Sequence, residues 1–205
     1  MRCITFKPDC CHLVIGERSG NLRQRKVDSG EDISPSVMRA KGHIYAVVAS
    51  MDGRWIVSGD LGNKVLVWST VTHKIVIQVS EHTHYVYAVD VSSDSMQVAS
   101  GSQDCTVRIF NIISGVRTIP PLHHNAPVVG VKFSPDGTRI ATATFHHISV
   151  GVYDVYSGDK LFDIPVQIIR KPITPLSWSS DGQQLFAASP GKITYFDTST
   201  SFCSE

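Results

Sequence analysis

The chain alternates short apolar runs with turns that are rich in Ser, Asp and Gly. Residues 47–58, 89–100, 131–142 and 176–187 each pass from an apolar alternation through such a turn into a second apolar run. Period-2 runs such as 64–68 and 106–110 place alternate side chains on opposite faces of a sheet. Because no stretch shows helical periodicity over a convincing window, the pattern predicts an all-β array of short antiparallel hairpins.

The pattern repeats with a period of about 43 residues. Turn aspartates stand at Asp9, Asp52, Asp94, Asp136 and Asp181, spaced by 43, 42, 42 and 45. An aromatic residue closes the third strand at Trp68, Phe110, Tyr153 and Phe196, spaced by 42, 43 and 43. Counting back from Trp68 leads to Arg25, where the aromatic is missing although the strand and turn remain in register. A period of 40 to 45 residues with four strands per unit is typical of a β-propeller blade.

Two of these units carry a family resemblance. Residues 82–89, the Ser93-Asp94 turn and residues 100–111 closely resemble a WD-repeat unit, and 133–137 with Tyr153-Asp154 are similar. The resemblance implies a WD-type β-propeller of about five consecutive four-stranded blades in a single domain. The expected units span approximately 1–38, 39–80, 81–122, 123–168 and 169–205.

The strand count predicts an open arc rather than a closed ring. Residues 1–7 already read as an innermost strand, and 192–196 read as a third strand with almost nothing after it. We therefore expect about nineteen strands with an incomplete last blade, most simply part of a ring of about seven blades. A bare flank at each end would expose apolar surface and unpaired strand edges.

The resemblance also implies a hydrogen-bonded tetrad of His, Ser or Thr, Asp and Trp in each blade, which this chain retains only in part. The members retained are His82, Ser100 and Asp104 in unit three, His124 and Thr142 in unit four, and Ser58 and Trp68 in unit two. Unit four has His146 in the place of the Asp, and unit two has Gly62 there. His43 is out of register by three residues, so we expect it on the innermost strand, with Ala40 in the tetrad position.

The composition limits which kinds of binding partner and which cellular compartments we expect. Nineteen basic and eighteen acidic side chains leave a formal charge of +1, which favours neither nucleic acid nor an anionic membrane. The five cysteines are odd in number and form no Cys-x-x-Cys pair, which disfavours disulfides and a thiolate zinc site. The apolar runs are too short to span a bilayer, and no secretion signal is recognisable. These features predict a cytoplasmic or nuclear protein that is not secreted.

Motifs of catalysis and cofactor binding are absent. The chain has no phosphate-binding glycine loop, no His-Glu-x-x-His and no Gly-x-Ser-x-Gly elbow. We expect neither an enzyme nor a cofactor, and no small-molecule substrate. One alternative concerns six histidines on loops at one end of blades three and four, where imidazoles could hold zinc or copper. They are His82, His84, His123, His124, His146 and His147, and the last four are the candidate ligands. The competing interpretation is that these are tetrad and exposed loop residues with no metal role.

The resemblance places the partner-binding surface at the narrow end, where the innermost strands begin. By register its residues are Arg2, Arg18, His43, Tyr45, Leu61, Tyr85, Tyr87, Gln103, Pro127, Val129 and Phe145. Tyr and Arg dominate interface energetics, although the tyrosines could also merely line the channel. The leading hypothesis is a non-catalytic scaffold for proteins or peptides. The alternatives are a regulatory or sensor segment of a larger multi-domain protein and the histidine metal site.

Overall fold

A computed structural model describes residues 3–33, 38–145, 149–165, 176–189 and 192–198. These residues form nineteen β-strands, and none of them is in a helix. The prediction of an all-β array of about nineteen strands is therefore confirmed. No helix among the described residues is long and apolar enough to cross a membrane.

The strands form five antiparallel sheets in chain order. Sheet one holds β1 (Cys3–Phe6), β2 (His12–Gly16), β3 (Asn21–Lys26) and β4 (Met38–Arg39). Sheet two holds β5 (Ile44–Ala49), β6 (Trp55–Asp60), β7 (Val65–Ser69) and β8 (Ile75–Val79). Sheet three holds β9 (Val86–Val91), β10 (Gln97–Ser102), β11 (Thr106–Asn111) and β12 (Leu122–His123). Sheet four holds β13 (Val128–Phe133), β14 (Arg139–Thr144), β15 (Ser149–Asp154) and β16 (Lys160–Pro165). Sheet five holds β17 (Leu176–Trp178), β18 (Gln184–Ser189) and β19 (Lys192–Asp197).

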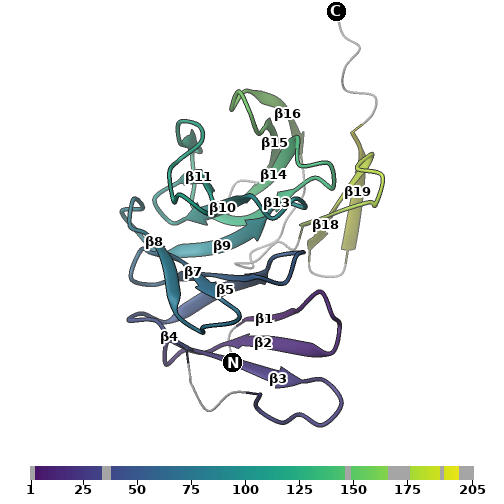
Figure 1. Ribbon diagram of the computed structural model, residues 1–205. Coiled ribbons are helices and arrows are strands. Elements are labelled where there is room, and N and C mark those ends of the chain that lie inside the picture. The colour runs from purple at the N-terminus through teal and green to yellow at the C-terminus, as the bar shows by residue number, and fades with distance from the viewer. Residues whose placement is uncertain (1–2, 34–37, 146–148, 166–175, 190–191, 199–205) are drawn as a thin grey trace, which may run out of the picture.

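The sheets follow one another in a curved row that does not close. Their first strands, β1, β5, β9, β13 and β17, each pack on the next in the series. Figure 1 shows the row turning from sheet one at the bottom of the view to sheet five at the right. Within the described residues, sheet five has three strands where the other sheets have four. The expected open arc with an incomplete last blade is confirmed.

Each interior sheet buries both faces because alternate side chains point to opposite neighbours. Ile56 and Trp68 of sheet two share a core cluster with sheet one. Val57 and Val67, one residue away on the same strands, share a different cluster with Phe110 of sheet three. All five side chains are at most 2% exposed, so the period-2 pattern directly produces the stacking.

Glycines allow the sheets to approach closely. A Cβ placed on Gly59 would lie 2.6 Å from Val86 Cγ1, and one on Gly101 would lie 2.7 Å from Val128 Cγ1. Each glycine lies near the end of the second strand of its sheet, and each valine is the first residue of the first strand of the next sheet. Only a residue without a side chain fits at these crossings.

The recurring aspartates have a local structural role in sheets two to five. The hydroxyl groups of Ser50, Ser92, Ser134 and Ser179 each donate to the aspartate two residues later, at 2.5–2.6 Å. The same serine oxygen accepts the backbone N–H three residues beyond that aspartate, at 2.8–2.9 Å. The turn residues thus satisfy one another, which explains why the Ser-x-Asp spacing marks the period so clearly.

A buried carboxylate also links two sheets. Asp90 on β9 accepts hydrogen bonds from the backbone N–H of Phe133 and from Lys132 Nζ on β13, both at 2.8 Å. Asp90 is 3% exposed. Burial raises the pKa of this carboxyl, while the positive charge of Lys132 and the donated hydrogen bonds act in the opposite direction. The interaction fixes the position of sheet four relative to sheet three.

Candidate functional site: a rim at one end of the sheets

One end of the row is a continuous rim, which we define as residues 17–20, 40–45, 60–63, 83–87, 103–105 and 124–127. Backbone hydrogen bonds join its segments. The Ile44 N–H donates to the Glu17 carbonyl at 3.3 Å, and the Leu61 N–H donates to the His43 carbonyl at 2.9 Å. Further along, the Gln103 N–H donates to the Tyr85 carbonyl at 2.9 Å. The first bond ties a turn of sheet one to the start of sheet two, and the other two tie the starts of sheets two and three to the turns after their own second strands. Asn63 Nδ2 also donates to the Thr83 carbonyl at 3.2 Å, which links sheet two to sheet three, so the rim is a fixed surface.

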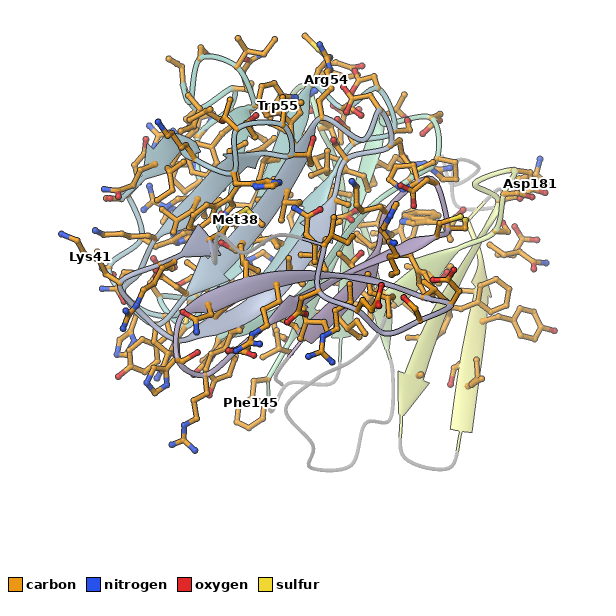
Figure 2. All side chains as sticks on the ribbon, turned by 60° about the horizontal axis from the view of Figure 1, so that its bottom comes forward. Met38, Lys41, Arg54, Trp55, Phe145 and Asp181 are labelled. Carbon is orange, nitrogen blue, oxygen red and sulfur yellow. The ribbon has the colours of Figure 1, made fainter. Side chains whose placement is uncertain are left out.

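The two ends of the sheets are well separated. Figure 2 shows Phe145, which follows β14 beside the rim, pointing away from the sheets at the bottom of the view. Arg54, in the turn between β5 and β6, and Trp55, the first residue of β6, lie at the top of the same view. The Phe145 N–H donates to the Pro127 carbonyl at 2.7 Å, which attaches Phe145 to the rim.

Three tyrosines form the centre of the rim. The ring centroids of Tyr45 and Tyr87 are 5.3 Å apart, and those of Tyr85 and Tyr87 are 6.5 Å apart. His84 packs edge-on against Tyr85 at 4.4 Å. The Tyr87 hydroxyl donates to Gln103 Oε1 at 2.7 Å. These contacts hold the rings in one cluster that spans sheets two and three.

β-bulges direct these side chains. The register of β5 shifts between Ile44 and Ala46, leaving Tyr45 as the extra residue, and Tyr87 is skipped in the same way in β9. A bulge of this kind turns a side chain out of the normal alternation. Tyr45 and Tyr87 are therefore aimed by the backbone.

The tyrosine cluster offers both apolar and polar contact. Tyr85 is 37% exposed, and Tyr45 and Tyr87 are half-buried. Burial raises the pKa of Tyr87, and the neighbouring Tyr45 and Tyr85 raise it further. The phenol therefore stays protonated at neutral pH and can donate a hydrogen bond. Rigid aromatic rings with polar tips are typical of binding hot spots rather than of catalytic groups.

The other predicted binding residues lie on or beside the rim with unequal access. Arg18 is exposed, and His43, Leu61, Gln103, Pro127 and Phe145 are partly buried. Val129 is the extra residue of a third bulge, in β13, but it is only 6% exposed. Its short side chain is less accessible than the tyrosines, and its place in the binding surface stays a prediction. Arg2 lies outside the described residues. His43 directly precedes β5 instead of lying on the innermost strand, and its carbonyl accepts the Leu61 N–H at the end of the β5–β6 pairing.

Beneath the rim, sheet three contains a nearly complete tetrad network. His82 Nδ1 and Asp104 Oδ2 are 2.8 Å apart, and His82 Nε2 lies 2.8 Å from Ser100 Oγ. Thr106, which the sequence analysis did not single out, donates its hydroxyl to Asp104 Oδ1 at 2.6 Å. Thr106 lies two residues after Asp104, so the Asp-x-Thr spacing could have indicated it. Phe110, in the place of the tryptophan, is 2% exposed and only packs.

The protonation of this network is set by burial and hydrogen bonding. Burial lowers the pKa of His82, although the Asp104 charge opposes that shift. Burial acts to raise the pKa of Asp104, but the hydrogen bonds from Thr106 and His82 outweigh it, so this pKa is lowered. A neutral His82 then donates from Nδ1 to the Asp104 carboxylate and accepts from Ser100 at Nε2. Because the network satisfies itself beneath the surface, its role is to position the loop that carries Tyr85.

Sheets two and four retain smaller parts of the tetrad. In sheet two the Trp68 indole N–H donates to Ser58 Oγ at 2.9 Å, and Ala40 is buried beside them. In sheet four His124 Nε2 lies 2.9 Å from Thr142 Oγ1, and its ring packs on Tyr153 with centroids 5.4 Å apart. Burial lowers the pKa of His124 from 6.5 to about 4, so its imidazole is neutral at pH 7.

Asp60 is a buried acid that the sequence analysis missed. Its side chain is fully buried, and Oδ1 accepts the Lys64 backbone N–H at 3.0 Å. Burial raises the pKa of this carboxyl, and the hydrogen bonds from Lys64 and Gly62 partly offset that shift. The resemblance placed an acid at the position of Gly62, two residues later. The sequence feature that could have indicated Asp60 is its position two residues after the retained Ser58.

The described residues give little support to the hypothesis of a histidine metal site. His146 and His147 lie outside them. Within the part of the chain that the structure describes, no three His, Cys, Asp or Glu side chains are grouped to hold a metal ion. A pocket of about 210 Å³ is lined by His123, His124, Tyr153, Lys160 and Asp163. The Lys160 ammonium pairs with Asp163 and His124 is engaged by Thr142, so the pocket presents no activated nucleophile.

A comparison of the sequence with known protein families identifies the family of the chain. The family described as "WD domain, G-beta repeat" matches residues 35–69, 73–111 and 116–155, which together cover more than half of the chain. Each match begins close to the outermost strand of one sheet and ends at the third strand of the next. No curated protein matches the chain significantly. The chain therefore belongs to the WD-repeat family, whose repeats generally mediate protein–protein interactions and whose domains are generally non-catalytic scaffolds.

Proposed function

We propose that this protein is a non-catalytic scaffold that binds a protein or an extended peptide at the rim. The observation that carries the proposal is the cluster of Tyr45, Tyr85 and Tyr87, in which β-bulges direct Tyr45 and Tyr87 and a hydrogen bond to Gln103 anchors Tyr87. Fixed aromatic side chains lose little conformational entropy when a partner binds, so their contact area contributes efficiently to affinity. The formal charge of +1 supports a protein partner over nucleic acid.

The chemistry of the buried groups supports the same proposal. The titratable groups of the tetrad, His82 and Asp104, are satisfied by each other and by hydroxyl groups. His124 is neutral, and its Nε2 is hydrogen-bonded to Thr142 Oγ1. A catalytic site needs a group that faces the substrate with a matched pKa, whereas these groups face into the sheets. They fit a framework that holds the rim.

Peptide selection tests the proposal directly. A displayed library of extended peptides is selected on the wild-type chain, and the enriched peptides are titrated by fluorescence anisotropy. Replacing Tyr85 and Tyr87 together by alanine should weaken binding by about 30- to 700-fold, since each aromatic hot spot contributes about 1–2 kcal/mol and 1.4 kcal/mol corresponds to a tenfold change. The matched control is Tyr156→Ala, a 69% exposed tyrosine in the turn between β15 and β16, at the opposite end of the sheets.

The control makes the outcomes distinct. Binding should be unchanged in Tyr156→Ala. If the rim variant binds the selected peptides as tightly as the wild type, or if Tyr156→Ala weakens them equally, the rim is not the binding surface.

We also propose that the protein acts in the cytoplasm or nucleus. Cys3, Cys10, Cys11 and Cys105 are free thiols, and Cys10 and Cys11 are exposed, which suits a reducing compartment. Imaging of a fluorescently tagged chain tests this proposal, and accumulation in the secretory pathway would contradict it.

A further inference from the structure

Unpaired positive charge lies beside the tyrosine cluster. Arg18 in the turn between β2 and β3, Arg39 at the end of β4 and Lys41 before β5 all have exposed side chains. In the part of the chain that the structure describes, none of the three forms an ion pair. Figure 2 shows Lys41 extending away from the ribbon at the left of the view. We call these three residues the basic patch.

Close backbone contacts bring the basic patch together. A Cβ on Gly20 would lie 2.6 Å from the Ala40 carbonyl oxygen, so the turn that carries Arg18 touches the segment that carries Lys41. The Ala40 N–H also donates to the Gly20 carbonyl at 2.8 Å. Ala40 is 4% exposed, whereas its two neighbours, Arg39 and Lys41, are exposed. The buried alanine therefore holds two basic side chains at the surface next to the turn that carries the third.

The acidic residues of the rim do not neutralise the basic patch. Glu17 pairs with Arg23 at 2.9 Å. Asp60 is fully buried, and the Asp104 side chain is 6% exposed and hydrogen-bonded to His82. Among the described rim residues, the unpaired exposed charges are therefore positive, although the formal charge of the whole chain is only +1. Such a local charge attracts anionic groups even when the net charge is close to zero.

One short peptide can contact both the basic patch and the tyrosine cluster. Lys41 precedes Tyr45 by four residues, and four residues of chain span at most about 14 Å. Because an extended peptide rises about 3.3 Å per residue, about four of its residues cover that distance. Tyrosine rings alone would also suit a cationic group of the partner. The basic patch would repel that group, so the charges of the rim favour an acidic partner.

We propose that the rim binds a protein segment in which an aspartate or glutamate lies within about four residues of an aromatic or large apolar side chain. The apolar side chain packs on Tyr45, Tyr85 and Tyr87, and the carboxylate pairs with Arg18 or Lys41. An arginine guanidinium can bind a carboxylate through two parallel hydrogen bonds. This inference rests on the proposed function, because it specifies the partner of the same rim.

The sequences of selected peptides give the first test. Peptides selected on the wild-type chain should be enriched in Asp and Glu near an aromatic or large apolar residue. Selection on Arg18→Gln combined with Lys41→Gln should lose the acidic enrichment and keep the apolar position. If the peptides are not enriched in acids but still need Tyr85 and Tyr87, this inference is overturned and the proposed function stands. If binding does not need the two tyrosines, both are overturned.

Fluorescence anisotropy with one enriched acidic peptide measures the contribution of charge. At low ionic strength, Arg18→Gln combined with Lys41→Gln should weaken binding by about 2- to 30-fold, the range expected for two exposed ion pairs. Replacing the acid of the peptide by its amide should weaken binding to the wild type but have little further effect on this variant. The matched control, Lys26→Gln combined with Lys74→Gln, removes the same charge from exposed lysines at the opposite end of the sheets.

The control pair should leave the affinity unchanged. Equal weakening by both pairs of substitutions would overturn the inference, because it would show an effect of net charge rather than of the basic patch. Additive losses from the peptide amide and the Arg18 and Lys41 substitutions would overturn it as well. A single-stranded thymidine oligonucleotide that binds the wild type more tightly than the acidic peptide would overturn it in favour of nucleic acid.

Discussion

The Trp68–Ser58 hydrogen bond gives the sharpest test of how the sheets are held together. Trp68 is 2% exposed, Ser58 is fully buried, and the indole N–H donates to the serine hydroxyl at 2.9 Å. Ser58→Ala removes the acceptor and leaves the indole N–H buried without a partner, which costs about 1–3 kcal/mol. Trp68→Phe leaves the serine hydroxyl unpaired and removes ring volume from the core, which costs about 2–3 kcal/mol.

The double variant separates the hydrogen bond from packing. With Ser58→Ala and Trp68→Phe combined, no polar group is left unpaired, so the loss should be smaller than the sum of the single losses by about 1–2 kcal/mol. The free energy of unfolding is measured by urea titration with circular dichroism. Ser93→Ala, at an exposed serine, serves as the control and should change stability by less than about 0.5 kcal/mol. Additive losses within about 0.5 kcal/mol would refute the reasoning.

Three further perturbations probe other parts of the fold. Asp90→Ala should lower the free energy of unfolding by about 2–4 kcal/mol, because the Phe133 N–H loses its acceptor and the Lys132 ion pair is lost; an effect below 1 kcal/mol in the urea titration would contradict the link between sheets. Because the pKa of His124 is about 4 in the folded chain and 6.5 in the unfolded one, the unfolded chain binds more protons between these values. Stability should therefore fall by about 3 kcal/mol between pH 6.5 and 4 on account of this group, and a His124→Gln variant with an equally steep pH profile would speak against it. Gly59→Ala should lower the free energy of unfolding through its clash with the next sheet by more than Gly53→Ala does, because Gly53 is a positive-φ turn residue with open space around it and its replacement should cost only about 1 kcal/mol; equal losses in the urea titration would remove the packing argument.

The sequence was sufficient to predict the succession of sheets. The period of the turn aspartates and the third-strand aromatics reflects contacts that recur in sheets two to five, namely the Ser-to-Asp hydrogen bond and the ring packed between sheets. Contacts that recur in this way leave a constant spacing between the residues in the sequence. The network of His82, Ser100 and Asp104 in sheet three was expected from the resemblance to WD repeats, which the register carried onto these residues.

The features that the sequence did not predict depend on backbone irregularity. A strict alternation gives no sign of the β-bulges at Tyr45, Tyr87 and Val129, yet the first two turn the tyrosines out of the normal alternation. The buried Asp60 was missed because its carboxylate is held by backbone N–H groups of its own turn, so no partner side chain marks it. A further example is the burial of Val129, which follows from the length of its side chain rather than from its position.

Hydrogen–deuterium exchange with a bound peptide tests most directly whether the stacked sheets serve to present the rim. With a peptide selected on the wild-type chain, exchange should slow at the rim segments 60–63, 83–87 and 103–105. It should remain unchanged in the turns at the other end of the sheets, at 93–96 and 113–116. Protection confined to those opposite turns, with none at the rim, would contradict the account.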